Sequence, residues 1–527
     1  MRERYTGFVA AGDSGAGDFG GYGDDDELYD AEWVAMPGVV GGTGRGFDGG
    51  YDNAPRFELA DVRRLARRAV RGVVGAARAD ERPTLSRYLR EHLGPEGAAH
   101  DVVAEGWAGY EHVDVQLGLD AWLAEDGRTH RLVGVSAFQH RSFGLAELFA
   151  GGASMRWEGP RPGNVARVNL PVGPGEEVLA CVRCGIYLVD EEAGPTALLL
   201  RDADPESGIG QVTVQIMSAD PERAPQIATE LRRLATVHNV FRHQVLSFAG
   251  SEVFDYEQAL LRFHERPSLS ADALVLPADT LQAVRRQVVE TARHKDRLLA
   301  AGQHLKRGLL LHGPPGVGKT HTIRYLMTSL TETTVVQVTG ESMHLLSAAC
   351  SVARALQPSM VVVEDVDLIA EDRGDHPGRH PLLFQLLNEM DGLEEDADVV
   401  FVLTTNRPDL LEPALASRPG RVDQAVELQL PDLEARRRLF DLYRGRLEVD
   451  RSNLDGVLER AEGVTASFIK ELLRRAAVLA ASRTDAPETE GLRVAAADLD
   501  DALEELLSTR NTMTRVLLGV AETRSDS

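Results

Sequence analysis

The segment GLLLHGPPGVGKT (308–320) has the residue spacing of a phosphate-binding loop. It fits the pattern G-x-x-x-x-G-K-[ST], with Gly313, Gly318, Lys319 and Thr320 at the fixed positions. Glycines let successive backbone N–H groups turn inward around phosphate oxygens, and the N-terminus of a following helix favours the same negative charge. We expect Lys319 to reach the β and γ phosphates of a nucleotide and Thr320 to bind Mg²⁺. The expected nucleotide-binding residues are Gly313, Pro314, Pro315, Gly316, Val317, Gly318, Lys319, Thr320 and His321.

Two later segments are apolar and end in polar side chains. MVVVEDVD (360–367) predicts a buried parallel strand with carboxylates at its carboxyl end. One of these carboxylates can hold hydrated Mg²⁺, and another can polarise the attacking water as a general base. VVFVLTTN (399–406) predicts a further strand, and we expect Asn406 at its end to lie beside the γ phosphate and help to place the water.

The elements that position these residues can be read from the same stretch. Leu309–Leu311 predicts a buried strand, and HTIRYLMTSL (321–330) predicts the helix after the loop. This strand–loop–helix context is what the motif requires. Only four lysines occur among 57 basic residues, and one of them, Lys319, stands where the loop needs a compact ammonium group.

Six segments of the chain form a recognisable set: GPPGVGKT (313–320), VVVEDVD (361–367), FQLLNEMDGL (384–393), TTNRPDLLEPAL (404–415), SRPGRVD (417–423) and GVTASFIKELLRRAA (463–477). Through these segments, residues of about 275–510 resemble the AAA ATPases, in the clade that includes FtsH, proteasomal ATPases and katanin-like remodellers. The resemblance implies a RecA-like P-loop αβα domain with a helical lid, ATP and Mg²⁺ as cofactors, and a homo-oligomeric ring that is usually hexameric. By position, Thr320 and Glu364 take the magnesium role, Asp365 the base role, and Arg421 the arginine finger that reaches a neighbour's γ phosphate.

The chain departs from the family pattern in three places. Most members have Asp-Glu where this chain has Glu364-Asp365, so its base is one methylene shorter. A second arginine often follows the finger by three residues, and here that position is Gln424. Residues 335–358 contain no Phe, Tyr or Trp, whereas ring translocases usually carry an aromatic pore loop there. The last difference argues against threading of a polypeptide.

Other absences bear on the function. The chain has no H-E-x-x-H motif of a fused protease and no hydrophobic-Tyr-X tail for docking to a proteasome. The resemblance itself implies an enzyme that uses ATP hydrolysis to remodel a protein client of unknown identity. Two alternatives stay open, a slow nucleotide switch that gates assembly as a scaffold, and a nucleic-acid-dependent ATPase that uses a basic helix at 57–79.

The rest of the 527 residues suggests several further parts. The expected organisation is a disordered acidic, Gly-rich arm (1–56), a helical segment (57–99), an α+β domain (100–250), a linker (251–275), the ATPase core (276–430), a helical lid (431–510) and a tail (511–527). Within the α+β domain, EVLACVRCGIYLVD (177–190) and TALLLRD (196–202) predict a hairpin, and HQVLSF (243–248) predicts a strand. The lone CxxC of Cys181 and Cys184 is interpreted as two ordinary strand cysteines, because no second pair completes a metal site.

The overall composition indicates which partners and which cellular compartment suit the chain. The balance of 57 basic and 82 acidic residues leaves a net charge of −25, which repels nucleic-acid phosphates and anionic lipids and argues against both as partners. Three cysteines cannot form a disulfide framework, and no apolar run approaches the roughly 18 residues of a membrane span. These features predict a cytoplasmic protein.

Overall fold

A computed structural model describes most of the chain between residues 84 and 508. The described ranges are 84–94, 101–136, 138, 143–150, 160–204, 210–248, 261–367, 381–394, 396–410, 422–483 and 492–508. The expected arm (1–56), most of the basic helical segment and the tail (511–527) therefore lie outside the described residues, as does Arg421.

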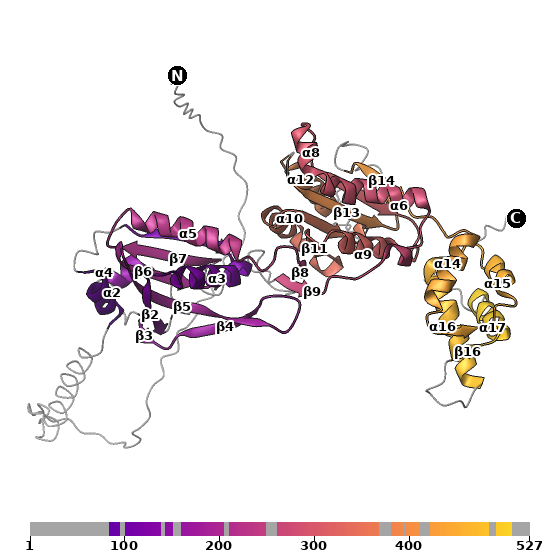
Figure 1. The fold of residues 1–527 in the computed structure, drawn as a ribbon, viewed down its shortest axis with the longest axis horizontal. Helices are drawn as coiled ribbons and strands as arrows, with labels where there is room; N and C mark the ends of the chain where they lie inside the picture. The colour runs from indigo at the N-terminus through magenta and orange to yellow at the C-terminus, as the bar shows by residue number, and fades with distance from the viewer. Residues whose placement is uncertain are drawn as a thin grey trace, which may run out of the picture. The chain divides into compact units, whose positions relative to one another are not determined.

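The first sheet is antiparallel and belongs to the amino-terminal domain (Figure 1). Its strand order is β1-β7-β6-β5-β2-β3, and β4 pairs with part of β5. The strands are β1 (Val103–Ala108), β2 (Thr129–Ser136), β3 (Arg161–Gly163), β4 (Ala166–Pro171), β5 (Val178–Glu191), β6 (Gly194–Arg201) and β7 (Gln211–Ser218). One face packs on α3 (His112–Leu123) and α5 (Arg223–Val237), and the other on α2 (Leu85–Leu93) and α4 (Leu145–Ala150).

The predicted hairpin is confirmed by the pairing of β5 with β6, which runs from Cys184↔Arg201 to Glu191↔Gly194. Cys181 and Cys184 lie on β5 and are fully buried, and burial raises the pKa of each thiol to about 12. Within the described residues no group of three His, Cys, Asp or Glu side chains is placed to hold a metal ion. The burial of both side chains on β5 agrees with the interpretation of the two as ordinary strand cysteines.

The second sheet carries the motif residues and has the order β14-β10-β13-β12-β11-β8-β9. All neighbours from β14 to β8 are parallel, and β9 runs antiparallel at the edge. The strands are β8 (Val245–Phe248), β9 (Leu261–His264), β10 (Arg307–His312), β11 (Thr334–Val338), β12 (Ser359–Val363), β13 (Val399–Thr405) and β14 (Gln424–Glu427). The carboxyl ends of β10, β12 and β13 therefore meet at one edge.

Both faces of this sheet are covered, which explains why its strands are apolar runs rather than alternating sequences. One core packs α9 (Lys319–Ser329) and α6 (Ala278–Arg285) against residues such as Leu309 and Val402. The other packs α10 (Leu346–Ala355) and α12 (Pro381–Asp391) against residues such as Phe401. The αβα architecture expected for the ATPase core is thus present.

Two expectations about the segment before the core are wrong. β8 was expected in the α+β domain (100–250), but it pairs in parallel with β11. β9 lies inside the expected linker (251–275) and pairs with β8. The apolar residues of these short strands, Leu246, Phe248 and Leu261, join the core beneath β11 and β12. Burial of these apolar side chains on the second sheet is favourable, so both strands belong to that sheet rather than to the expected α+β domain and linker.

The helical segment that precedes β10 is divided into several elements. It is described as α6, a π-helical turn (Arg286–Glu290), α7 (Thr291–Arg293) and α8 (Lys295–Ala300), with 3₁₀ turns at Ala271–Ala273 and Gly340–Leu345 elsewhere in the core. The expected lid is helical and has its own core. It consists of α14 (Leu433–Tyr443), α15 (Leu454–Arg460), α16 (Ala466–Arg483) and α17 (Ala496–Leu507), with a small parallel pair of β15 (Glu448–Val449) and β16 (Arg493–Val494).

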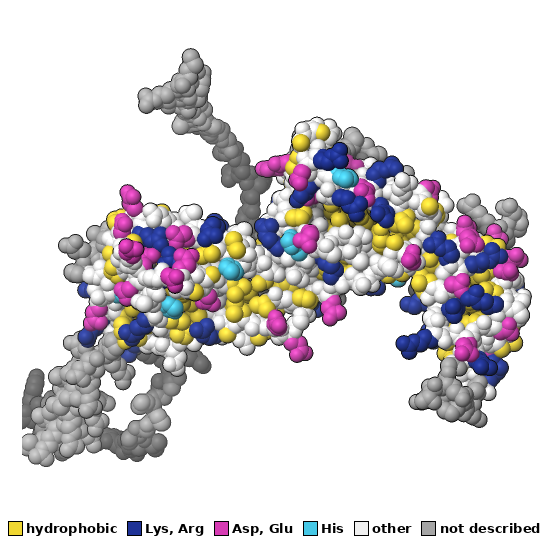
Figure 2. All heavy atoms as spheres, viewed as in Figure 1, with side chains coloured by type: hydrophobic (Ala, Val, Ile, Leu, Met, Phe, Trp, Pro, Cys, Tyr) yellow, Lys and Arg dark blue, Asp and Glu magenta, His cyan; other side chains and the backbone are white. Residues whose placement is uncertain are grey.

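Charged side chains on the lid are interspersed rather than separated by sign. On the face drawn in Figure 2, basic and acidic groups alternate over this region. Ion pairs such as Arg437–Asp455 and Arg460–Asp500 belong to this mixed surface. In the part of the chain that the structure describes, no helix combines the length and apolar character required to cross a bilayer.

Candidate functional site: a phosphate-binding loop beside an acidic turn

The loop between β10 and α9 has the backbone of a phosphate cradle. Gly313, Gly316 and Gly318 have φ values of 144°, 83° and 110°, which side chains other than hydrogen rarely tolerate. A Cβ on Gly313 would also lie 2.3 Å from the carbonyl oxygen of Leu428. The glycines of the motif are therefore required by conformation and by close packing, and they leave room for a ligand to approach the backbone.

The lid contacts this loop at Gly316. The backbone N–H of Ser467 donates to the carbonyl oxygen of Gly316 at 3.3 Å, and a Cβ at Gly316 would lie 2.9 Å from the Ser467 Oγ. Thr465 stands equally close, with its Oγ1 3.0 Å from that position. The turn at Gly463–Ser467 thus lies against the phosphate-binding loop.

Lys319 opens α9 and is almost completely buried, with 7% of its surface exposed. Its Nζ donates to the carbonyl oxygens of Gly313 (2.8 Å) and Pro314 (3.0 Å) and to the Oδ1 of Asn406 (2.7 Å). Burial lowers the pKa of Lys319, and the negative charges of Asp365 and Asp367 oppose that shift. The ammonium group is thus held at the mouth of the loop, and its present partners are neutral oxygens that an anion can replace.

The acidic residues follow β12 and form a turn at the same edge, Glu364–Asp367, which we call the acid turn. The Oγ1 of Thr320 donates to the Oε2 of Glu364 at 2.7 Å. The Nδ2 of Asn406 donates to the Oδ1 of Asp365 at 3.2 Å. The amide of Asn406 therefore bridges Lys319 and Asp365. The three strand ends have brought together every motif residue that the structure describes.

Asp367 differs from its two neighbours in the acid turn. It is buried, with 8% of its surface exposed, and its Oδ1 accepts from the Thr405 Oγ1 (2.8 Å) and the Asn406 N–H (3.2 Å). These bonds direct the carboxylate to the end of β13, so Asp367 is not placed to serve as the base. Sequence reasoning missed this role for Asp367 and Thr405, and its only local signal was the pair of threonines before Asn406.

The remaining predicted residues of the loop have different surroundings. Pro315 is exposed and Pro314 half-buried, while Val317 packs in the core beside α9. His321 is half-buried on α9, and burial together with Arg324 and Lys470 lowers its pKa. Gln424, at the position where the family often has a second arginine, begins β14 and pairs with Leu309 in the sheet.

The donor set suits a nucleotide phosphate and Mg²⁺. Backbone N–H groups and one ammonium group can balance phosphate charge, and the paired oxygens of Thr320 and Glu364 are the hard ligands that Mg²⁺ prefers. Asp365 supplies a carboxylate that can accept a proton, and Asn406 lies between it and Lys319. This combination can bind a phosphorylated ligand and activate a water beside it.

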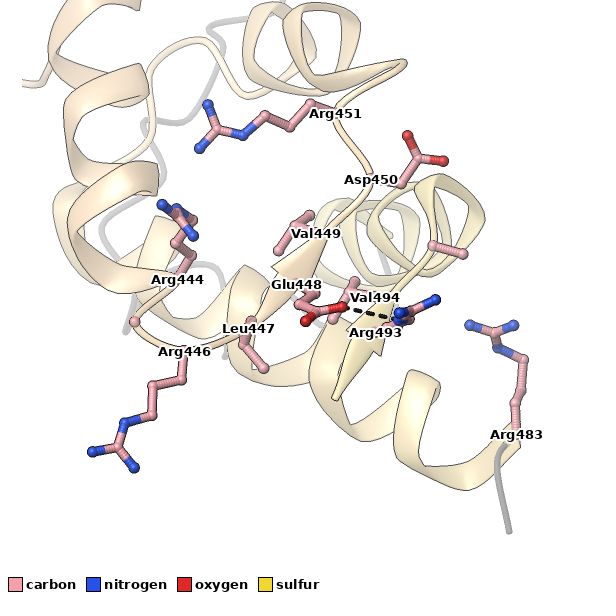
Figure 3. A pocket seen from close by; sticks show the side chains of 12 residues that line it. Arg444, Arg446, Leu447, Glu448, Val449, Asp450, Arg451, Arg483, Arg493 and Val494 are labelled. Carbon is pink, nitrogen blue, oxygen red and sulfur yellow. Dashed lines mark hydrogen bonds and ion pairs between the residues drawn. The ribbon is translucent and has the colours of Figure 1, made fainter. Parts of the chain in front are cut away.

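A separate cavity of about 760 Å³ lies on the lid and is rich in arginine (Figure 3). Most of these arginines already pair with acids: Arg493 with Glu448 at 2.9 Å, Arg451 with Asp441, and Arg483 with Asp498. Arg444 and Arg483 also follow or end helices, where a cation offsets the carbonyl dipoles. The cavity contains none of the motif residues, and most of its arginines have structural partners.

Comparison with known proteins identifies the motif-bearing region. Residues 309–430 match the model of the "ATPase family associated with various cellular activities (AAA)". The match begins in β10 and ends just before the lid, so it contains the phosphate-binding loop, the acid turn and Asn406.

Individual relatives match over a similar region. The ATP-dependent zinc metalloprotease FtsH of Thermus thermophilus is 31% identical over 248 residues, covering 44% of this chain and 38% of that protein. FtsH 2 of Sphaerobacter thermophilus is 34% identical over 42% of this chain and 35% of its own length. The proteasome-activating nucleotidase of Pyrococcus horikoshii is 30% identical over 41% of this chain and 57% of its own length. The chain thus spans well under two thirds of each of these relatives.

Proposed function

From the AAA-family ATPase domain that this chain carries, we propose that the protein binds and hydrolyses ATP in a homo-oligomeric ring and uses the energy to remodel a protein client. The observation that carries the proposal is the contact of Asn406 with both Lys319 and Asp365. The ammonium group that would bind a phosphate and the carboxylate that would accept a proton thereby lie on either side of one amide, as hydrolysis of a terminal phosphate requires.

The residues divide the chemistry among them. The loop from Gly313 to Gly318 surrounds the phosphates with backbone N–H groups, and Lys319 neutralises the β and γ oxygens. Thr320 and Glu364 would hold Mg²⁺, which when bound would offset the charge of the phosphates. Asp365 accepts the proton of the attacking water, and Asn406 orients that water.

The ring is supported by the relatives and by Arg421. The FtsH enzymes and the proteasome-activating nucleotidase share the ATPase region with this chain, and the resemblance assigns Arg421 as a finger for the neighbouring subunit. Arg421 lies outside the described residues, so its role rests on its position in SRPGRVD. A ring of six subunits and a cytoplasmic location remain predictions from the sequence.

A second candidate is a slow nucleotide switch that gates assembly. It is favoured by the order Glu364-Asp365 and by the lack of aromatic residues over 335–358. Phosphate release separates the two candidates: a remodelling enzyme turns over continuously and faster with its client, whereas a switch hydrolyses about one ATP per binding event. A nucleic-acid-dependent enzyme would instead be stimulated by DNA or RNA.

The proposal is tested with the full chain by phosphate release in the presence of ATP and Mg²⁺, beside Lys319→Ala. We expect steady turnover by the native chain and none by the variant. Protein captured on Asp365→Asn with ATP, but not with ADP, identifies the client. A native chain that releases no phosphate, alone or with the captured protein, would contradict the proposal.

A further inference from the structure

Two residues other than glycine have a left-handed backbone among the residues described here, Asp365 (φ 54°) and His243 (φ 62°). This conformation is uncommon for residues with a Cβ, although Asp, Asn and His adopt it more readily than others. It persists only where the surroundings fix it. Something in the structure must therefore hold each of these residues in place.

The same kind of hydrogen bond, from the backbone N–H to a threonine hydroxyl, holds each of these two residues. The N–H of Asp365 donates to the Oγ1 of Thr404 at 2.9 Å, and the N–H of His243 donates to the Oγ1 of Thr334 at 2.9 Å. Both threonines are buried, with 1% and 0% of their surfaces exposed. Thr404 lies near the carboxyl end of β13, beside the acid turn, whereas Thr334 begins β11 at the opposite edge of the same sheet.

The hydroxyl of Thr404 marks where β12 leaves the sheet. The parallel register of β12 and β13 ends at Val363↔Leu403, one residue before Glu364 and Thr404. Beyond this point the N–H of Asp365 donates to the Thr404 side chain instead of to a carbonyl oxygen of the neighbouring strand. The chain turns there, and the Asp365 carboxylate comes to lie 3.2 Å from the Nδ2 of Asn406.

We propose that Thr404 is a positioning residue for ATP hydrolysis, because its hydroxyl fixes the left-handed backbone that delivers the short carboxylate of Asp365 to Asn406. The inference rests on the proposed role of Asp365 as the base. Asp367 supports the same arrangement from the other end of the acid turn through Thr405 and the N–H of Asn406. Hydrogen bonds to the end of β13 thus hold the acid turn at the N–H of Asp365 and at the carboxylate of Asp367.

The test compares two threonines with the same contact. Thr404→Val removes the hydroxyl at nearly constant volume and leaves the N–H of Asp365 without its acceptor. We expect kcat to fall by about 10- to 100-fold, because a misplaced base loses most of its contribution, while the Kd for ATP changes by less than about twofold. Thr404→Ser keeps the hydroxyl and should restore kcat to within about threefold of the native value.

Thr334→Val is the matched control. It removes an equivalent hydroxyl beneath a left-handed residue far from the acid turn, so Tm should fall as in Thr404→Val while kcat is retained. The inference is overturned if Thr404→Val keeps native kcat, or if Thr334→Val lowers kcat equally. Asp365→Asn separates a failure of the proposed base from a failure of the proposed role of Thr404. If Asp365→Asn stays active, the assignment of Asp365 as the base is wrong. If Asp365→Asn is inactive while Thr404→Val is active, only the role of Thr404 is refuted.

Discussion

The Nζ of Lys319 donates to the Oδ1 of Asn406 at 2.7 Å, although the two residues are 87 positions apart in the chain. The other end of the same amide donates to Asp365. Asn406 can therefore respond to both the phosphate-binding side and the acidic side of the site. Each of the following predictions perturbs one part of this arrangement or of the domains around it.

Lys319→Ala should weaken ATP binding by more than a hundredfold, a loss of about 3 kcal/mol. The reason is that the loop's N–H groups alone balance only part of the phosphate charge. Calorimetry with ATP and Mg²⁺ measures the change. Lys306→Ala is the control, because this half-buried lysine precedes β10 at the edge away from the loop. Near-native affinity of the Lys319 variant would refute the assignment of the loop.

Glu364→Gln should raise the Mg²⁺ concentration needed for half-maximal activity, by about tenfold or more, because an amide is a weaker and uncharged ligand. The carboxylate already accepts from Thr320, the other residue proposed to hold the ion. The measurement is a Mg²⁺ titration of phosphate release at saturating ATP. An unchanged titration curve would remove Glu364 from the metal site.

Asp114 makes the stability of the α5–β8 junction depend on pH. This buried carboxyl on α3 accepts from the N–H of Val240 at 2.8 Å and from the Nδ2 of Asn239 at 2.6 Å. Burial, together with the nearby Glu111, raises the pKa of Asp114 to about 8, although the hydrogen bond from Val240 and the charge of Arg242 oppose the shift. The folded state therefore keeps this proton to higher pH than the unfolded chain does, and the associated stability is lost as pH rises through about 8.

Asp114→Asn removes this titration. Relative to the native chain, the variant should gain stability between about pH 6 and about pH 9, because only the native chain must then bury a carboxylate. Urea unfolding at the two pH values measures the difference. A stability difference that is the same at both pH values would show that Asp114 does not titrate in this window.

A finger supplied in trans makes two inactive variants complement each other. Lys319→Ala and Arg421→Ala should each be inactive alone, since a finger contributes about 10³-fold or more to the rate. After subunit exchange in equal mixtures, random head-to-tail assembly gives roughly a quarter of interfaces an intact loop and an intact finger. Phosphate release should reappear at up to that fraction. No recovery in mixtures shown to co-assemble would mean that Arg421 does not act on a neighbour.

The motif residues could be predicted from sequence because each one comes after an apolar strand, either directly or at the end of a loop, and parallel strands bring their carboxyl ends to one edge. Lys319, Asp365 and Asn406 follow this rule. The places of β8 and β9 could not be predicted, since short apolar strands carry no sign of which sheet they will join. The contact of Thr404 with Asp365 also needed the structure, because it depends on strand register and on a left-handed residue.

The chain's departure from the family pattern has a structural counterpart. Aspartate adopts a left-handed backbone more readily than most residues, and Asp365 has that conformation. Asp365→Glu should therefore lower turnover rather than improve it, although it restores the residue that most members carry. Phosphate release at saturating ATP measures this, and a faster Asp365→Glu enzyme would mean that the backbone does not favour the shorter side chain.

Asp365→Asn tests most directly whether this site hydrolyses ATP with its own carboxylate as the base. The amide keeps the size of the side chain but cannot accept a proton from water. At saturating ATP and Mg²⁺, we predict phosphate release at least about 100-fold below that of the native chain, with ATP affinity in calorimetry unchanged within about twofold. Native turnover by Asp365→Asn would contradict the account, because Asp365 would then have no part in activating water.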